Sequence, residues 1–298
     1  MRSPRASPLP LVLLALVLGC RRHGRGGAGD AGTPPPPEVG LQGRVTVKGS
    51  DSMVVLCQRW AELFMKAHPG VSLQVTGGGS GTGLAALING TTDIAMSSRP
   101  LEDAERQQLR QQHPSGPVEL AVARDGITFY VHETNPVDAL TLAQLAGIYQ
   151  GDLTRWQEVG GAQAPIIVYS RESSSGTYAF VKQAVLGGQD FTERAQALPG
   201  TAAVVDAVAH ELHGIGYGGA AYARSVKGVK VLKVKRREAD LPVAPTPEHL
   251  QDGTYPLGRA LYFDLPHEAS GATQAFLEMV LSPEGQRLVS QVGYFPVK

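Results

Sequence analysis

Four turns rich in serine and glycine stand where a predicted strand passes into a predicted helix. These turns are Gly49-Ser50-Asp51-Ser52-Met53, Gly79-Ser80-Gly81-Thr82, Ser97-Ser98-Arg99 and Arg171-Glu172-Ser173-Ser174-Ser175-Gly176-Thr177. Each turn offers hydroxyls and unpaired backbone N–H groups near the positive end of a helix dipole, which is a favourable place for an anion. Their glycines let the backbone approach a ligand closely.

One such turn by itself is an ordinary helix N-cap, because serine and threonine are usual capping residues. Four of them are better explained as one site, since the turns at the carboxyl ends of parallel strands gather where an α/β sheet binds its ligands. Arg171 adds a positive charge, and a guanidinium holds an oxyanion through two parallel hydrogen bonds. The residues therefore predict an anion pocket made mostly of neutral donors.

The elements that would position these turns alternate between strand and helix, as in an α/β fold. Apolar residues at alternate positions indicate the strands, and apolar residues at helical spacing indicate the helices. Strands are expected over residues 44–49, 71–76, 93–96 and 166–169. Helices are expected over 53–67, 84–88, 102–112, 178–186 and about 272–291, the last broken around Ser282-Pro283. Residues 118–131 are expected to form a long strand or a pair of strands, interrupted at Asp125-Gly126, and residues 235–258 an irregular segment.

Enzyme motifs are missing from the sequence, which has neither a G-x-S-x-G nucleophile elbow nor a P-loop. His210 and His213 are three residues apart, whereas the helical zinc motif needs a spacing of four. No third ligand accompanies them. We therefore expect no catalytic residue, no cofactor and no metal.

Composition excludes further classes of protein. The 298 residues form one large domain or two smaller ones. Lysine and arginine total 27, as do aspartate and glutamate, so no basic face for a nucleic acid is expected. The two cysteines exclude a disulfide scaffold. No apolar run has the 18 or so residues that a membrane-spanning helix needs.

The N-terminus is typical of a secretory signal, predicted over residues 1–19, with basic Arg2 and Arg5 before a short apolar stretch. The segment ends in Val17-Leu18-Gly19-Cys20, which resembles the lipobox of bacterial lipoproteins. Cys20 would then carry the lipid, and the alternative is an ordinary cleaved signal with a chance cysteine. Residues 20–43, rich in glycine, arginine and proline, are expected to form a disordered tether. Cys57 is left as a buried free thiol.

Together these residues resemble a phosphate-binding protein, the extracytoplasmic receptor of a bacterial ABC phosphate importer, in the type II periplasmic-binding-protein superfamily. The resemblance runs from about Val45 to Val297. Its most specific element is Arg171 followed by Ser175-Gly176-Thr177, and it also includes Gly214-Ile215-Gly216-Tyr217, Tyr255-Pro256-Leu257 and Leu281-Ser282-Pro283-Glu284-Gly285-Gln286.

The resemblance implies an α/β fold of two lobes with the ligand in the cleft between them. Lobe one would comprise residues 44–127 and 256–298, and lobe two residues 128–255, with crossing segments near 125–130 and 255–261. It implies that phosphate is bound by Ser52, the backbone N–H of Met53, Ser80, Ser98, Arg171, Ser175, Gly176 and Thr177.

One departure concerns Ser98, because some members of the family carry there an aspartate that accepts a hydrogen bond from protonated phosphate. Asp51 or Ser97 is a candidate for an additional ligand or acceptor, and the alternative role of Asp51 is to cap the helix after Met53.

The expected function is capture of inorganic phosphate by an exported, lipid-anchored monomer that passes the ion to the permease subunits of an ABC transporter. The membrane would be contacted through the N-terminal lipid only. Three alternatives remain open at this point. They are a receptor for another oxyanion such as sulfate or molybdate, a phosphatase-like enzyme on the same scaffold, and a surface protein without a transport role.

Overall fold

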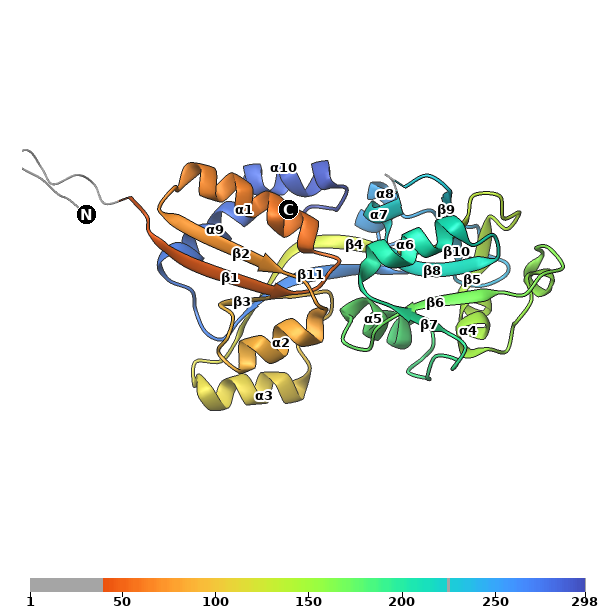
Figure 1. Cartoon of the computed structure of the whole chain (residues 1–298), viewed down its shortest axis with the longest axis horizontal. Helices are drawn as coiled ribbons and strands as arrows, with labels where there is room; N and C mark the ends of the chain where they lie inside the picture. The colour runs from red at the N-terminus through yellow and green to blue at the C-terminus, as the bar shows by residue number, and fades with distance from the viewer. Residues whose placement is uncertain (1–39, 224–225, 298) are drawn as a thin grey trace, which may run out of the picture. The chain divides into compact units, whose positions relative to one another are not determined.

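The computed structural model describes residues 40–223 and 226–297, shown in Figure 1. The predicted signal peptide, Cys20 and nearly all of the predicted tether lie outside the described residues. Among the residues that are described, no helix combines the length and the hydrophobicity needed to cross a membrane.

The chain begins with alternating strands and helices, as expected. In order these are β1 (Gly43–Gly49), α1 (Val54–Ala67), β2 (Val71–Thr76), α2 (Ser80–Ile88), β3 (Ile94–Ser97) and α3 (Asp103–Gln112). The last elements, α9 (Gly271–Leu281) and α10 (Pro283–Val292), return to this part of the chain. In Figure 1, α1, α9 and α10 cover one face of the β1–β3 sheet, and α2 and α3 cover the other.

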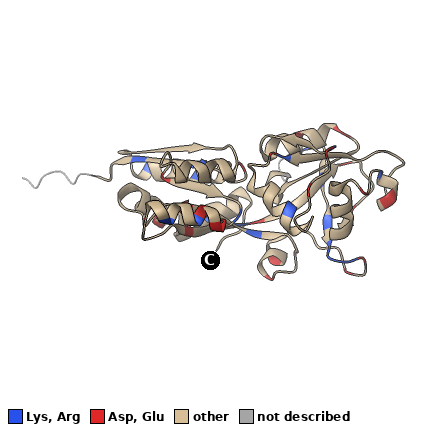
Figure 2. Ribbon diagram, turned by 90° about the horizontal axis from the view of Figure 1, so that it is seen from below, with Lys and Arg blue, Asp and Glu red and all other residues tan. Residues whose placement is uncertain are grey.

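The elements between them are, in order, β4 (Val118–His132), β5 (Ala139–Thr141), α4 (Leu142–Gln150), the 3-10 helix η1 (Trp156–Val159), β6 (Ile167–Arg171), α5 (Gly176–Ala184), β7 (Gln196–Leu198), α6 (Gly200–His210), β8 (Gly214–Gly219), α7 (Ala220–Ala223), β9 (Val229–Val231), β10 (Lys233–Lys235), α8 (Pro247–Gln251) and β11 (Gly258–Leu265). Helix α8 lies within the segment that was expected to be irregular. Figure 2 shows basic and acidic residues interspersed along the ribbon.

Nine strands of the described chain form one sheet, in the order β2-β1-β3-β11-β4-β8-β6-β7 with β9 beside β4. Strand β1 is parallel to β2 and β3, and β6 is parallel to β7 and β8. Strand β11 runs antiparallel to both β3 and β4. The serine-bearing turns follow the carboxyl ends of β1, β2, β3 and β6, which is where such a sheet binds ligands.

Strand β4 is continuous, so the predicted interruption at Asp125-Gly126 is wrong. The strand changes partner at this point, pairing with β11 up to Gly126 and with β8 from Ile127 onward. Its backbone hydrogen bonds therefore continue across the glycine, which sequence periodicity alone does not reveal.

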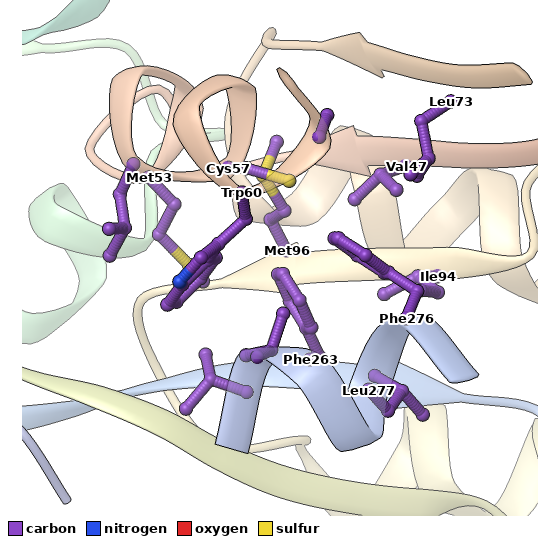
Figure 3. Close-up of a cluster of buried hydrophobic side chains, with 14 of the residues drawn as sticks. Val47, Met53, Cys57, Trp60, Leu73, Ile94, Met96, Phe263, Phe276 and Leu277 are labelled. Atoms are coloured by element: carbon purple, nitrogen blue, oxygen red, sulfur yellow. The ribbon is translucent and has the colours of Figure 1, made fainter. Parts of the chain in front are cut away.

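The two largest of the four hydrophobic clusters among the described residues lie at the two ends of this sheet. The first core contains Trp60 and Phe64 of α1 against Phe263 and Phe276, with ring centroids 5.7 Å apart for Trp60–Phe263 and 5.5 Å for Phe64–Phe276 (Figure 3). Cys57 lies in this core as a buried free thiol, as expected, and burial raises its pKa. The second core gathers Ile127, Phe129, Tyr149, Trp156 and Tyr217.

Two helices begin earlier than expected. Helix α2 begins at Ser80 rather than at residue 84, although Gly81 and Gly83 weaken a helix. Gly83 is needed there, because a Cβ on it would lie 2.4 Å from the carbonyl oxygen of Lys48 on β1. Helix α5 begins at Gly176, directly after its capping residue Ser175. Both helices thus bring their first turn into the region of the candidate site.

Candidate functional site

Four buried serines come together at the ends of β1, β2 and β3. Ser50, Ser52, Ser80 and Ser98 are each at most 3% exposed. The hydroxyls of Ser50 and Ser98 are hydrogen-bonded to each other, and the backbone N–H of Ser98 donates to Ser80 Oγ at 3.0 Å. The first three turns therefore form one group of hydroxyls.

The fourth turn reaches the same place from β6 and α5. Ser175 caps α5, since its Oγ accepts the backbone N–H groups of Thr177 at 3.2 Å and Tyr178 at 3.3 Å. Thr177 Oγ1 lies 3.1 Å from Ser52 Oγ at the start of α1. The first and the fourth turns, 125 residues apart, are thus in hydrogen-bond contact.

Gly176 lies directly against the second and third turns. A Cβ on this residue would lie 2.3 Å from Ser80 Oγ and 3.2 Å from Ser98 Cβ, so a side chain here requires its neighbours to move. The backbone N–H of Gly81 also donates to the carbonyl of Ser174 at 2.9 Å. As the first residue of α5, Gly176 has no carbonyl within the helix for its own N–H.

Met53 and Ser97 make other contacts. The backbone N–H of Met53 donates to the carbonyl of Ser50 at 2.9 Å, so this donor is already used. The Met53 side chain lies in the first core (Figure 3). Ser97 bonds within its own turn, donating to the carbonyl of Arg99 at 2.6 Å. Neither residue adds a free polar group to the cluster in this structure.

Arg171 is 3% exposed and faces the first turn. Its Nη1 donates to Thr201 Oγ1 and its Nη2 to Asp51 Oδ2, both at 2.8 Å. Its buried Nε has no hydrogen-bond partner, so this N–H is available to a ligand. Burial lowers the pKa of the guanidinium, and the Asp51 carboxylate opposes this shift.

The capping role considered for Asp51 is wrong. The N-cap position of α1 is occupied by Met53, and no side chain caps the start of this helix. The Asp51 carboxylate instead binds Arg171 through Oδ2 and accepts the Gly78 N–H through Oδ1 at 2.8 Å. It is thus the counter-ion of Arg171 and a link between the first and second turns.

A second arginine, Arg259 of β11, enters the cluster without having been predicted. Its Nη2 lies 3.1 Å from Asp125 Oδ2, 3.0 Å from Thr177 Oγ1 and 3.4 Å from Ser52 Oγ. Its Nη1 donates to the carbonyl of Ser98 at 3.2 Å. Burial raises the pKa of Asp125, and the adjacent guanidinium opposes that shift. The cluster therefore holds two guanidiniums and two carboxylates, not one cation alone.

This arrangement suits a small oxyanion. Each guanidinium is matched by one carboxylate, so the cluster has little net charge, and the remaining donors are hydroxyls and helix N-termini. The cluster is almost sealed from solvent, so an ion would enter only if the α5 turn separated from the other three. Within residues 40–223 and 226–297 no group of three or more His, Cys, Asp or Glu side chains is placed to hold a metal.

Comparison with known proteins gives a consistent result. Residues 31–284 match the model of the PBP superfamily domain. The phosphate-binding protein PstS of Pseudomonas aeruginosa is 32% identical, and the alignment covers 97% of this chain and 95% of that protein.

Solved structures agree in fold as well. A Clostridium perfringens protein crystallised with bound phosphate superposes with a TM-score of 0.77 at 30% identity, covering 86% of this chain and all of that one (100%). An ABC-type phosphate transport receptor from Vibrio cholerae gives a TM-score of 0.69 at 28% identity, with coverage of 84% and 99%.

Proposed function

The chain belongs to the phosphate-binding proteins of the PBP superfamily, and on this premise we propose that it captures inorganic phosphate for an ABC importer. It has the two-lobed type II fold predicted from its sequence, as its structural neighbours confirm. The observation that carries the proposal is the meeting of all four serine-bearing turns in one buried cluster. The protein would act outside the cytoplasm as a monomer and leave the ion chemically unchanged.

The proposed ligands are the hydroxyls of Ser52, Ser80, Ser98, Ser175 and Thr177, the guanidinium of Arg171 and the N–H of Gly176. Their burial, their mutual contacts and the unpartnered Nε of Arg171 support this set. The Met53 N–H can join only if its hydrogen bond to Ser50 opens. We propose no direct role for Ser97, whose hydroxyl is turned to Arg99.

The lobes are proposed to be residues 44–127 with 256–298, and residues 128–255. The two separate cores support this division, and β4 and β11 run between them. Contacts such as Ser52–Thr177 and Arg171–Asp51 join residues from different proposed lobes, and on this ground we propose that the cleft is closed in this structure. Closure around phosphate would present the surface that the permease subunits recognise.

Calorimetric titration of the ligand-stripped protein with phosphate, arsenate and sulfate tests this function. Phosphate and arsenate are expected to bind one per molecule at the same site, and each should displace the other. Sulfate is expected to bind more weakly. The opposite order, with sulfate or molybdate bound and phosphate ignored, would favour a receptor for another oxyanion. Absence of binding by every anion would favour a surface protein without a transport role.

We further propose that the protein is anchored by a lipid on Cys20 after removal of residues 1–19, because Val17-Leu18-Gly19-Cys20 resembles a lipobox. In a bacterial host, Cys20→Ala should move the protein from the membrane fraction to the soluble exported fraction. Cys57→Ala is the matched control, since Cys57 is buried in the first core and should leave membrane association unchanged. A Cys20→Ala variant that stays with the membranes would refute the lipid anchor.

A further inference from the structure

Resting on the proposed function and the proposed lobes, we propose that Tyr222 is a positioning residue that holds the cleft closed. Its hydroxyl, on α7 in lobe two, donates to the main-chain carbonyl of Asp51 in lobe one at 2.7 Å. Through this bond Tyr222 sets the lifetime of the phosphate complex without touching the ion.

The side chain of Tyr222 packs against both proposed lobes. It lies against the first core, which belongs to lobe one, and against a smaller cluster in lobe two formed by Tyr130, Val204, Val205 and Val208. Helix α7 itself is in contact with α6, β8 and β9, all in lobe two. In Figure 1, α7 lies on the same side of the sheet as α1 and α10. Tyr222 therefore bridges the seam between the lobes, and separation of the lobes would draw its ring away from the first core.

The first turn is held from both lobes. Within lobe one, the hydroxyl of Tyr294 donates to the carbonyl of Ser52. From lobe two, Arg171 Nη2 donates to the carboxylate of Asp51 at 2.8 Å, and Tyr222 donates to the carbonyl of the same residue. The Tyr294 bond can persist in an open cleft, whereas the other two exist only when the lobes meet. Of these two, Arg171 is a proposed ligand of the ion and Tyr222 is not.

A small hollow beside the Tyr222 ring makes this bond reversible. The hollow has a volume of about 130 Å³ and is lined by Val55, Val292 and Tyr294 of lobe one and by Ala221 and Tyr222 of lobe two. Val55 is 44% exposed, so water reaches the seam at this point. When the lobes separate, water can replace each partner of the Tyr222–Asp51 bond. After this exchange, such a bond favours the closed molecule by a net factor of roughly two to twelve.

The bond acts alike on every anion that the cleft encloses. Burial raises the pKa of Tyr222 to about 12, so its hydroxyl keeps its hydrogen at neutral pH. The apparent dissociation constant of a receptor that must close on its ligand is the intrinsic constant divided by the closed fraction. Loss of the Tyr222 hydroxyl lowers that fraction, so it should raise the dissociation constants of different anions by one common factor and speed their release.

Tyr222→Phe tests the proposal, because it removes the hydroxyl and keeps the ring. Calorimetric titrations with phosphate and with arsenate should give dissociation constants that are both raised roughly two- to twelvefold, with their ratio unchanged. Radiolabelled phosphate, chased with unlabelled phosphate, should leave the variant faster by a similar factor. Tyr149→Phe is the matched control, since the Tyr149 hydroxyl donates to the carbonyl of Tyr169 at 3.4 Å within lobe two. This control should bind and release both anions as the native protein does.

Thermal unfolding separates a bond of the closed cleft from one that supports the fold in every state. The ligand-free native protein should be open, and small-angle scattering should show it to be less compact than the phosphate complex. The Tyr222–Asp51 bond is then absent without phosphate, so ligand-free Tyr222→Phe should unfold at the native midpoint. With equal, saturating phosphate the variant should unfold at a lower temperature than the native complex. Tyr222→Leu, which also removes the ring from the first core, should bind both anions more weakly than Tyr222→Phe.

Several results would overturn the inference while leaving the proposed function intact. Native dissociation constants and release rates in Tyr222→Phe would show that the bond has no part in closure. A changed ratio of phosphate to arsenate affinity would place the effect of the hydroxyl in the pocket. An equal loss of thermal stability with and without phosphate, or a ligand-free native protein as compact as its complex, would make Tyr222 a purely structural residue. Failure of the native protein to bind phosphate would instead refute the proposed function, and the inference with it.

Discussion

Replacing Arg171 with alanine is expected to abolish phosphate binding at micromolar concentrations. Removal of one partner from a buried ionic contact costs about 3–5 kcal/mol, which corresponds to a loss of roughly two to three and a half orders of magnitude in affinity. The loss should be at the upper end here, because Asp51, which Arg171 holds at 2.8 Å, would be left as an uncompensated carboxylate beside the anion. Calorimetric titration of Arg171→Ala against the native protein measures the effect.

A second substitution separates the lost cation from the stranded carboxylate. Arg171→Ala combined with Asp51→Asn removes both charges, so it should bind phosphate more tightly than Arg171→Ala alone and still far more weakly than the native protein. Arg124→Ala, an exposed arginine outside the cluster, should bind normally. Thermal unfolding of each variant shows whether the fold is retained. An Arg171→Ala protein that folds and keeps the native dissociation constant would remove Arg171 from the site.

Replacing Gly176 with valine is expected to prevent the cleft from closing. A Cβ at this position lies 2.3 Å from Ser80 Oγ, and a valine adds two further methyl groups. Overpacking of this kind costs about 1–3 kcal/mol, which predicts phosphate affinity lower by roughly one to two orders of magnitude. Small-angle scattering with saturating phosphate should show a more open molecule than the native complex.

The matched control for this variant is Gly40→Val, since no atom lies within 4 Å of a Cβ built on Gly40. This substitution should change neither the affinity nor the scattering. Gly176→Ala should fall between the native protein and Gly176→Val. If Gly176→Val closes normally and binds phosphate with native affinity, the close packing of the α5 turn against Ser80 and Ser98 has no part in binding.

The parts of the site that were predictable from the sequence are those encoded locally. A strand end, a serine and a following helix lie within a few residues of each other in each turn, and Ser175-Gly176-Thr177 begins α5 as a single stretch. The identity of these turns could therefore be read from residue type and spacing. Their meeting in one cluster was expected from the general rule for α/β sheets.

The ion pairs were not predictable, because long-range strand register creates them. Arg259 and Asp125 are 134 residues apart and face each other only because β11 pairs with β4 in antiparallel register. Arg171 and Asp51 are 120 residues apart on different proposed lobes. A carboxylate such as Asp51 beside the start of a helix is also typical of an N-cap, so the sequence favoured capping of the adjacent helix over an ion pair with the distant Arg171. The continuity of β4 was not predictable for the same reason. It depends on pairing with β11 before Gly126 and with β8 after it, and both strands are distant in the sequence.

The location of the bound ion is the central point of this account, and an arsenic anomalous difference map of crystals grown with arsenate measures it directly. The account predicts one strong peak within hydrogen-bonding distance of Ser52 Oγ, Thr177 Oγ1 and the Arg171 guanidinium, and phosphate added in excess should remove it. A strong peak elsewhere in the molecule, with none in this cluster, would contradict the account.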